Sequence, residues 1–161
     1  MCIRDRVDFN PVADRLRVMG MSGANLRINV ENGQVVKDGA PKYGAGTAWA
    51  ETTPRVVAGA YTNSMAGATA TMLYTVDTMT RTLNLQAPPN DGVQQPKGEI
   101  AASLPAGVAF DIMPEAGGGN MAVLLAGNTL HHLDLANGKA TQVGMVSGLP
   151  QAEVIDIAVM P

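Results

Sequence analysis

Short runs of alternating apolar and polar residues follow one another along the whole chain. Clear examples are RLRVMG at 15–20, TMLYTVD at 71–77 and NMAVLLAG at 120–127. Such runs, rich in Val, Leu and Thr, are typical of half-buried β-strands. The 10 prolines and 18 glycines interrupt the chain at short intervals, and no window sustains the apolar period of a helix. The pattern therefore predicts an all-β fold.

A pattern of an apolar residue, then Asn or Asp, then a turn occurs three times, at residues 28–33, 76–81 and 133–138. Each copy lies between two strand-like runs and therefore predicts a hairpin. Asn-Gly supplies the positive φ angles that tight turns require, and the upstream Asn or Asp side chain accepts a backbone hydrogen bond as an Asx-turn. The predicted turns are at Asn32-Gly33, Thr80-Arg81 and Asn137-Gly138.

A second element recurs ahead of two of these hairpins. VDFNP at 7–11 matches FDIMP at 110–114, and IDI at 155–157 begins a further copy whose predicted strand is Val154–Met160. With the intervening runs, one unit contains four short strands in about 40–50 residues, which is the size of a propeller blade. The sequence predicts one domain over residues 7–161 with about three four-stranded antiparallel blades, an incomplete β-propeller.

The middle unit is less regular than the other two. VVAGAYTN at 56–63 and TMLYTVD at 71–77 are predicted strands, but the first strand of the unit is not evident. We expect the loop at 44–54 to replace or obscure it.

Composition excludes several classes of function. Among 161 residues, 46% are apolar and 16% charged, and 11 basic and 14 acidic side chains give a net charge of −3. This balance predicts no nucleic-acid partner. The single cysteine, Cys2, excludes an internal disulfide framework and a cysteine-based zinc cluster. No apolar run reaches the roughly 18 residues that cross a bilayer, so no membrane span is predicted.

The first six residues, MCIRDR, resemble a leader that recurs on proteins predicted from metagenomic reads and looks like translated adapter. We therefore expect Met1–Arg6 to be non-native and exclude these residues from fold reasoning. The native chain is then expected to begin further upstream.

The stretch LHHLDLANG places two histidines near an aspartate, a composition seen in metal sites. Successive side chains on a strand point to opposite faces, so His131 and His132 diverge and do not chelate one ion. His131 corresponds to Leu26 and Tyr74 in the other hairpins, which predicts a packed residue. His132 shares its face with Asp134; we predict a solvated polar face there, with half of a metal site as the alternative.

The remaining polar residues form no catalytic constellation. Asp8, Asp111 and Asp156 recur at equivalent positions, which favours a shared structural role, with a polar ring around a central channel as the alternative. The glycine-containing turns at 88–92 and 115–120 match neither a P-loop nor a dinucleotide fingerprint, and no serine lies in a G-x-S-x-G elbow. The sequence predicts neither a catalytic residue nor a cofactor.

The runs at 7–39, 58–77 and 84–92 closely resemble the bacterial DUF4394 family, a domain of unknown function. The DFNPxxDRLRV run at 8–18 is the specific part, and the similarity extends from residue 7 to residue 161. Members look like secreted or envelope-associated propeller-like proteins with a further N-terminal repeat segment. The resemblance therefore implies an extracytoplasmic location and an N-terminally truncated fragment, and it offers no catalytic residues to carry over.

Two functional hypotheses remain. The first is a non-enzymatic binding or scaffold module that takes an unknown ligand or protein partner at one face of the propeller. It is favoured because the sequence forms no nucleophile–base pair and no ligand cluster. The second is a propeller-type hydrolase or lactonase with a metal held by inner-strand Asp and Asn residues. Its candidate metal ligands are Asp8, Asn10 and Asp111.

Overall fold

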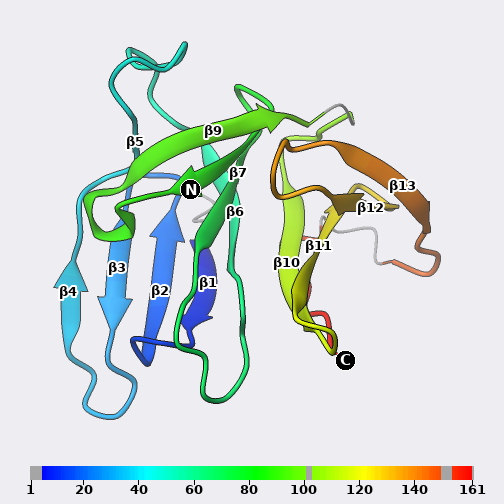
Figure 1. Ribbon diagram of the computed structural model, residues 1–161. Helices are drawn as coiled ribbons and strands as arrows, with labels where there is room; N and C mark the ends of the chain where they lie inside the picture. The colour runs from blue at the N-terminus through cyan, green and yellow to red at the C-terminus, as the bar shows by residue number, and fades with distance from the viewer. Residues whose placement is uncertain (1–4, 101–102, 150–153, 161) are drawn as a thin grey trace.

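The computed structural model describes residues 5–100, 103–149 and 154–160. These residues form three β-sheets, and within them the one helical element is the short 3-10 helix η1 (Pro89–Asp91). The three sheets stand side by side in Figure 1, with the first on the left and the third on the right. The predicted all-β class is confirmed. Over the described ranges the sheets form no closed propeller.

The first and third sheets are four-stranded antiparallel meanders, as predicted. The first consists of β1 (Asp5–Asn10), β2 (Arg15–Gly20), β3 (Asn25–Ile28) and β4 (Val35–Lys37). The third consists of β10 (Val108–Glu115), β11 (Gly119–Ala126), β12 (Thr129–Leu133) and β13 (Ala140–Met145). β1 begins at Asp5, ahead of the predicted domain start at residue 7, and the origin of Met1–Arg6 stays a prediction.

The second sheet differs from the prediction for the middle unit. It has five strands in the order β5-β9-β8-β7-β6, with bounds β5 (Lys42–Tyr43), β6 (Val56–Tyr61), β7 (Leu73–Asp77), β8 (Thr82–Gln86) and β9 (Val93–Glu99). The first strand of this unit is β6 itself, so the expectation that the loop at 44–54 replaces it is wrong. The hairpin at 76–81 consequently joins the second and third strands of its unit. In the other two sheets the matching hairpin joins the third and fourth strands.

The fourth strand of this unit, β9, was missed because its sequence VQQPKGE has no apolar alternation and contains Pro96. Proline lacks the N–H group that a ladder needs and is therefore confined to strand edges. β9 meets this condition, since its outer neighbour β5 pairs only with Val93 and Gln94. Beyond Gln94 the outer side of β9 is an edge at which Pro96 is tolerated.

The three predicted hairpin turns are confirmed, and all three have the same Asx-turn geometry. The Asx residue that begins each turn accepts a hydrogen bond from the backbone N–H two residues later. Four residues after it the chain has a positive φ angle, at Gly33, Arg81 and Gly138. The same geometry closes the β1–β2 turn, in which Asn10 is the Asx residue and Asp14 has a φ of 53°. The recurring Asn and Asp positions thus mark turns.

The main core lies between the second and third sheets. It combines Val57, Ala58, Tyr74, Val76 and Leu83 of the second sheet with Phe110, Ile112, Leu124 and Leu133 of the third. The two sheets also approach closely where β9 meets the β12–β13 turn, because a Cβ atom on Gly98 of β9 would lie 1.8 Å from the carbonyl oxygen of Asn137. Glycine at residue 98 therefore permits the β12–β13 turn to lie against β9.

The structure separates the two histidines as predicted. His131 is 9% exposed and lies opposite Leu124 in the ladder, on the core face of the third sheet. His132 is exposed on the other face. The correspondence of His131 with Leu26 holds, because both lie on the third strand of their sheets, whereas that with Tyr74 is wrong because β7 is a second strand.

Candidate functional site

The candidate site lies where β1, β6 and β10 meet, and we call these three the central strands. β6 contacts both β1 and β10 although the three belong to different sheets, and they occupy the middle of the molecule in Figure 1. Residues 154–160 lie beside them, with the backbone N–H of Val159 donating a hydrogen bond to Asp111. The predicted strand Val154–Met160 is wrong, because these residues pair with no ladder. They nevertheless take the position next to β10 that a further central strand would occupy.

Asp8 joins the first sheet to the second. Its Oδ1 accepts a hydrogen bond from the N–H of Phe9 at 2.6 Å. Its Oδ2 accepts one from the N–H of Tyr61 on β6 at 2.5 Å. Both carboxylate oxygens of Asp8 therefore hold backbone N–H groups, one on each side of the contact between the sheets.

Asp111 makes the same pair of hydrogen bonds between the third sheet and residues 154–160. Its Oδ1 accepts the N–H of Ile112 at 2.8 Å, and its Oδ2 accepts the N–H of Val159 at 2.7 Å. Asp156 makes the local half of the arrangement, accepting the N–H of the next residue, Ile157, at 3.0 Å. We call Asp8, Asp111 and Asp156 the repeated aspartates.

The repeated aspartates accept hydrogen bonds from backbone N–H groups that the central strands leave without a ladder partner. Each central strand is the edge of its sheet, so N–H groups on its open side have no ladder partner. Buried N–H groups without an acceptor are costly and therefore rare. Asp8 supplies an acceptor to Tyr61, and Asp111 supplies one to Val159. Their recurrence in the sequence is thus explained by one structural role.

The contact between β6 and β10 has neither the aspartate nor the N–H donor at these two positions. Tyr61 lies three residues after Ala58, and Val159 lies three residues after Asp156. By this spacing Ala58 takes the aspartate position in the second sheet, and Pro114, three residues after Asp111, takes the donor position in the third. Proline has no N–H group, so by this spacing the third sheet offers no donor that would require an aspartate at residue 58.

The repeated aspartates also line a common cavity of about 170 Å³, together with Val7, Gly59, Phe110, Ile157 and Ala158. Burial raises the pKa of Asp8 to about 6, and the nearby charges of Asp111 and Asp156 add to the increase although two backbone hydrogen bonds oppose it. Burial likewise raises the pKa of Asp156. The cavity therefore disfavours the accumulation of negative charge.

The structure brings together two of the three predicted metal ligands. Asp8 and Asp111 line the same cavity, whose lining among the described residues does not include Asn10. The Oδ1 atom of Asn10 accepts the N–H groups of Val12 and Ala13 at 2.9 and 2.8 Å inside the β1–β2 turn. In the described ranges, no three His, Cys, Asp or Glu side chains are grouped so as to hold a metal ion. The metal set itself stays a prediction.

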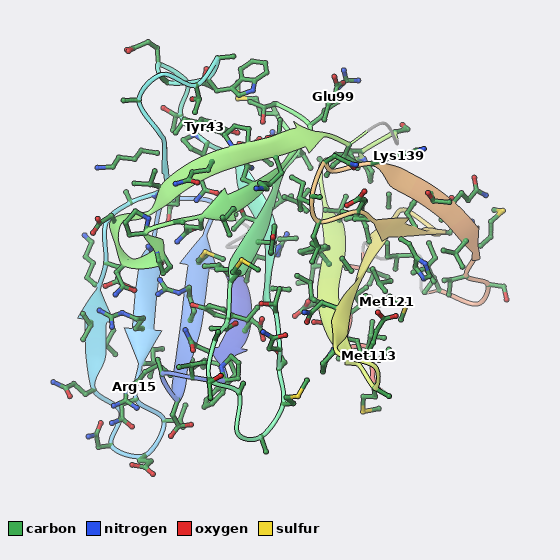
Figure 2. All side chains as sticks on the ribbon, in the orientation of Figure 1. Arg15, Tyr43, Glu99, Met113, Met121 and Lys139 are labelled. Carbon is green, nitrogen blue, oxygen red and sulfur yellow. The ribbon has the colours of Figure 1, made fainter. Side chains whose placement is uncertain are left out.

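A larger pocket opens at one end of the central strands, and we call it the mouth pocket. Its volume is about 340 Å³, and its lining is Asp8, Phe9, Pro11, Ser64, Met65 and Ala66. The β1–β2 turn and the loop at 62–72 form its walls, at the lower end of the molecule where Figure 2 labels Arg15, Met113 and Met121. A reciprocal pair of amide hydrogen bonds between Asn63 and Asn120, at 2.8 and 2.9 Å, fixes this loop to β11. Sequence reasoning missed this pocket, because Ser64 and Met65 lie in a loop without a motif.

A buried guanidinium fixes the first sheet against the second beside this site. Arg17 of β2 donates to the hydroxyl of Tyr61 at 2.6 Å and to the side chain of Asn90 at 2.8 Å. It also forms an ion pair with Asp38 at 3.1 Å. Arg17 lies directly opposite Asp8 in the β1–β2 ladder. The wall that positions Asp8 is therefore held by a hydrogen-bonded network rather than by apolar packing alone.

The third sheet borders a separate cavity of about 590 Å³. Its lining includes Ser103, Leu104, Thr129, Gln142 and His131. The Nδ1 atom of His131 has no hydrogen-bond partner among the described residues. This cavity lies away from the repeated aspartates and contains none of them.

Three sheets, the first joined to the second by a carboxylate-to-backbone hydrogen bond and the second packed on the third through an apolar core, define an all-β domain with a polar centre. The chain belongs to the DUF4394 family, described as a domain of unknown function, whose model matches residues 4–158. The resemblance seen in the sequence is confirmed over nearly the whole chain. No curated protein and no solved structure matches the chain. Over the described ranges, no helix has the length and apolar character to span a bilayer.

Proposed function

We propose that this chain is a non-catalytic binding module of a propeller-like protein outside the cytoplasm, and that its ligand occupies the mouth pocket. The observation that carries this proposal is the mouth pocket itself. It is lined mainly by apolar side chains and has Asp8, whose pKa is raised to about 6, in its wall. A concave apolar pocket with few polar groups and a perturbed titratable residue is the usual form of a small-ligand site.

A binding role agrees better with the bonding of Asp8 than catalysis does. A general base or a nucleophile needs a carboxylate oxygen free to reach the reacting atom. Both oxygens of Asp8 hold backbone N–H groups of the fold. Each oxygen retains a further lone pair, so Asp8 still accepts a hydrogen bond from a ligand. Asp8 thus supports recognition of a donor group without being released from its structural role.

The surroundings of Asp8 favour a cationic ligand with an apolar body. Asp111 and Asp156 contribute negative charge close to Asp8, and an ammonium group would relieve this repulsion. Phe9, Pro11 and Met65 offer apolar surface to the rest of the ligand. We therefore assign the mouth pocket to small organic ammonium compounds.

The test is a titration of the full chain with n-hexylammonium, followed through the backbone amide signals in NMR. We expect saturable shifts at Phe9, Ser64 and Met65, and at least threefold weaker binding of neutral n-hexanol because it lacks the charge. Met65→Ala should weaken binding, whereas Met79→Ala is the matched control, since Met79 is exposed in the distant β7–β8 turn. Shifts that do not saturate, or that ignore the Met65 substitution, would contradict the proposal.

A further inference from the structure

The cavity of about 590 Å³ beside the third sheet has a lining of its own, and we call it the histidine cavity. β12, β13 and the residues ahead of β10 form its walls, on the right of Figure 1. Among the described residues, its lining shares no member with the mouth pocket or with the cavity of the repeated aspartates. The histidine cavity is therefore a separate candidate site.

His131 lines this cavity with an imidazole that the chain leaves unpaired. The side chain is 9% exposed, and its buried Nδ1 atom has no hydrogen-bond partner among the described residues. Packing does not require an imidazole, because Leu26 takes the equivalent position on β3. A buried polar atom without a partner is rare, and it costs free energy that a leucine would avoid. The identity of residue 131 therefore calls for an explanation beyond packing.

A β-bulge places a second polar side chain beside His131. The ladder between β12 and β13 shifts its register between Leu130 and His131, so that Leu130 lies opposite Gly144 and His131 lies opposite Gln142. In an unbroken ladder Val143 would lie opposite His131. Bulges are frequent beside functional sites, where they re-aim a side chain. Here the bulge gives His131 an amide neighbour in place of an apolar one, and that amide also lines the cavity.

The rest of the lining is uncharged and mixes hydrogen-bonding groups with apolar surface. Among the described residues, the lining contains no Asp, Glu, Lys or Arg side chain. Its polar members include Ser103, Thr129 and Gln142, and its apolar members include Leu104, Ala126 and Ala140. A charged ligand would lose water here without gaining a counter-charge. A neutral ligand that carries several hydroxyl groups on an apolar frame meets both kinds of surface.

We propose that the histidine cavity binds a neutral hexose sugar, with one sugar hydroxyl bonded to the imidazole of His131. A hydroxyl both donates and accepts, so it pairs with an N–H or with a bare nitrogen of the ring, and also with the amide of Gln142. The cavity volume lies within the usual range of small-molecule sites, about 300–1,000 Å³. This proposal is independent of the ligand in the mouth pocket, because the two sites share no residue.

The test is a titration of the full ¹⁵N-labelled chain with D-glucose, D-galactose and D-mannose at constant pH, followed through the imidazole nitrogen signals in NMR. The chain has two histidines, so both ring systems are observed separately. We expect at least one hexose to give saturable shifts at His131 and none at His132. The uronic acid of the same sugar should bind at least threefold more weakly, because its carboxylate finds no counter-charge in the cavity.

His131→Leu and His132→Leu form a matched pair of variants. His131→Leu should fold, since Leu26 holds the equivalent position, and should weaken hexose binding at least tenfold in the backbone amide signals of the cavity. His132 is exposed on the other face of the sheet, so His132→Leu should bind like the unmodified chain. Gln142→Leu changes an exposed side chain and should also weaken binding, and thermal melting establishes that each variant is folded.

Three results would overturn the proposal. They are the absence of saturable shifts with all three hexoses, equal shifts at both histidines, and unchanged affinity in folded His131→Leu. The first would mean that water alone occupies the cavity. Binding of an ammonium compound in the mouth pocket is read at other residues, so its failure and the failure of hexose binding are told apart.

Discussion

Replacing Ala58 by Asp is expected to lower the free energy of unfolding by about 3–5 kcal/mol, the cost of an uncompensated buried charge. Ala58 is 1% exposed on β6. By sequence spacing the position is equivalent to that of Asp8, and the corresponding donor position in the third sheet holds Pro114, which has no N–H group. The new carboxylate would therefore be buried beside the third sheet without a hydrogen-bond donor. Urea denaturation of the two proteins measures the loss.

A second substitution separates the missing donor from simple crowding. Pro114→Ala restores an N–H group at the donor position, and charge-assisted hydrogen bonds to backbone N–H are strong. In the double variant we expect a favourable coupling of at least about 1 kcal/mol between the two positions, obtained from a double-mutant cycle. Ala58→Asn adds a side chain of similar size without the charge and serves as the control. A coupling near zero would show that Ala58 and Pro114 do not form the contact inferred here.

Lowering the pH from 7 to 4 is expected to stabilise the chain relative to an Asp8→Asn variant by about 2.4 kcal/mol, because one pKa unit corresponds to about 1.4 kcal/mol and the unfolded carboxyl is itself partly protonated at pH 4. The pKa of Asp8 rises from 3.8 to about 6 in the folded protein. Between these two values the folded state binds a proton that the unfolded state does not. Stability due to Asp8 is therefore greatest below pH 4 and is lost as the pH rises through 6.

The comparison uses denaturation curves of both proteins at several pH values. Asp14→Asn removes an exposed carboxylate from the same hairpin and is the control for the loss of a carboxylate as such. The Asn side chain suits the positive φ angle of residue 14. An Asp8→Asn variant whose stability runs parallel to that of the unmodified chain from pH 4 to pH 7 would refute the raised pKa.

The fold of the first and third sheets followed from the sequence because their strands alternate regularly and their turns carry Asx residues. The second sheet did not follow, and the reason is local. Its strand β9 contains Pro96 and polar residues, which are tolerated because β5 pairs with β9 only at Val93 and Gln94, but an alternation pattern does not reveal such a strand. Because the sequence does not reveal β9, it places the hairpin at 76–81 between the third and fourth strands of its unit, whereas it joins the second and third. The comparison of His131 with Tyr74 is wrong for the same reason.

Of the candidate site, the sequence predicts only that the same aspartate position recurs in several units. Asp8, Asp111 and Asp156 repeat in the sequence, and the shared structural role expected of them agrees with their hydrogen bonds to backbone N–H groups. Their partners Tyr61 and Val159 come from other units, and no short-range pattern connects them. The role of Pro114 likewise depends on which strand lies opposite it, so it emerges only after the strands are placed in space.

Asp8 and Asp111 each hold a backbone N–H group of the neighbouring unit, and this arrangement is the basis of the site. Amide hydrogen exchange by NMR tests it most directly, because protection of a single N–H group reports on its hydrogen bond. We expect Asp8→Ala to abolish protection at Tyr61 while sparing Val159, and Asp111→Ala to do the reverse. Unchanged protection of both amides in both variants, with the fold intact, would contradict it.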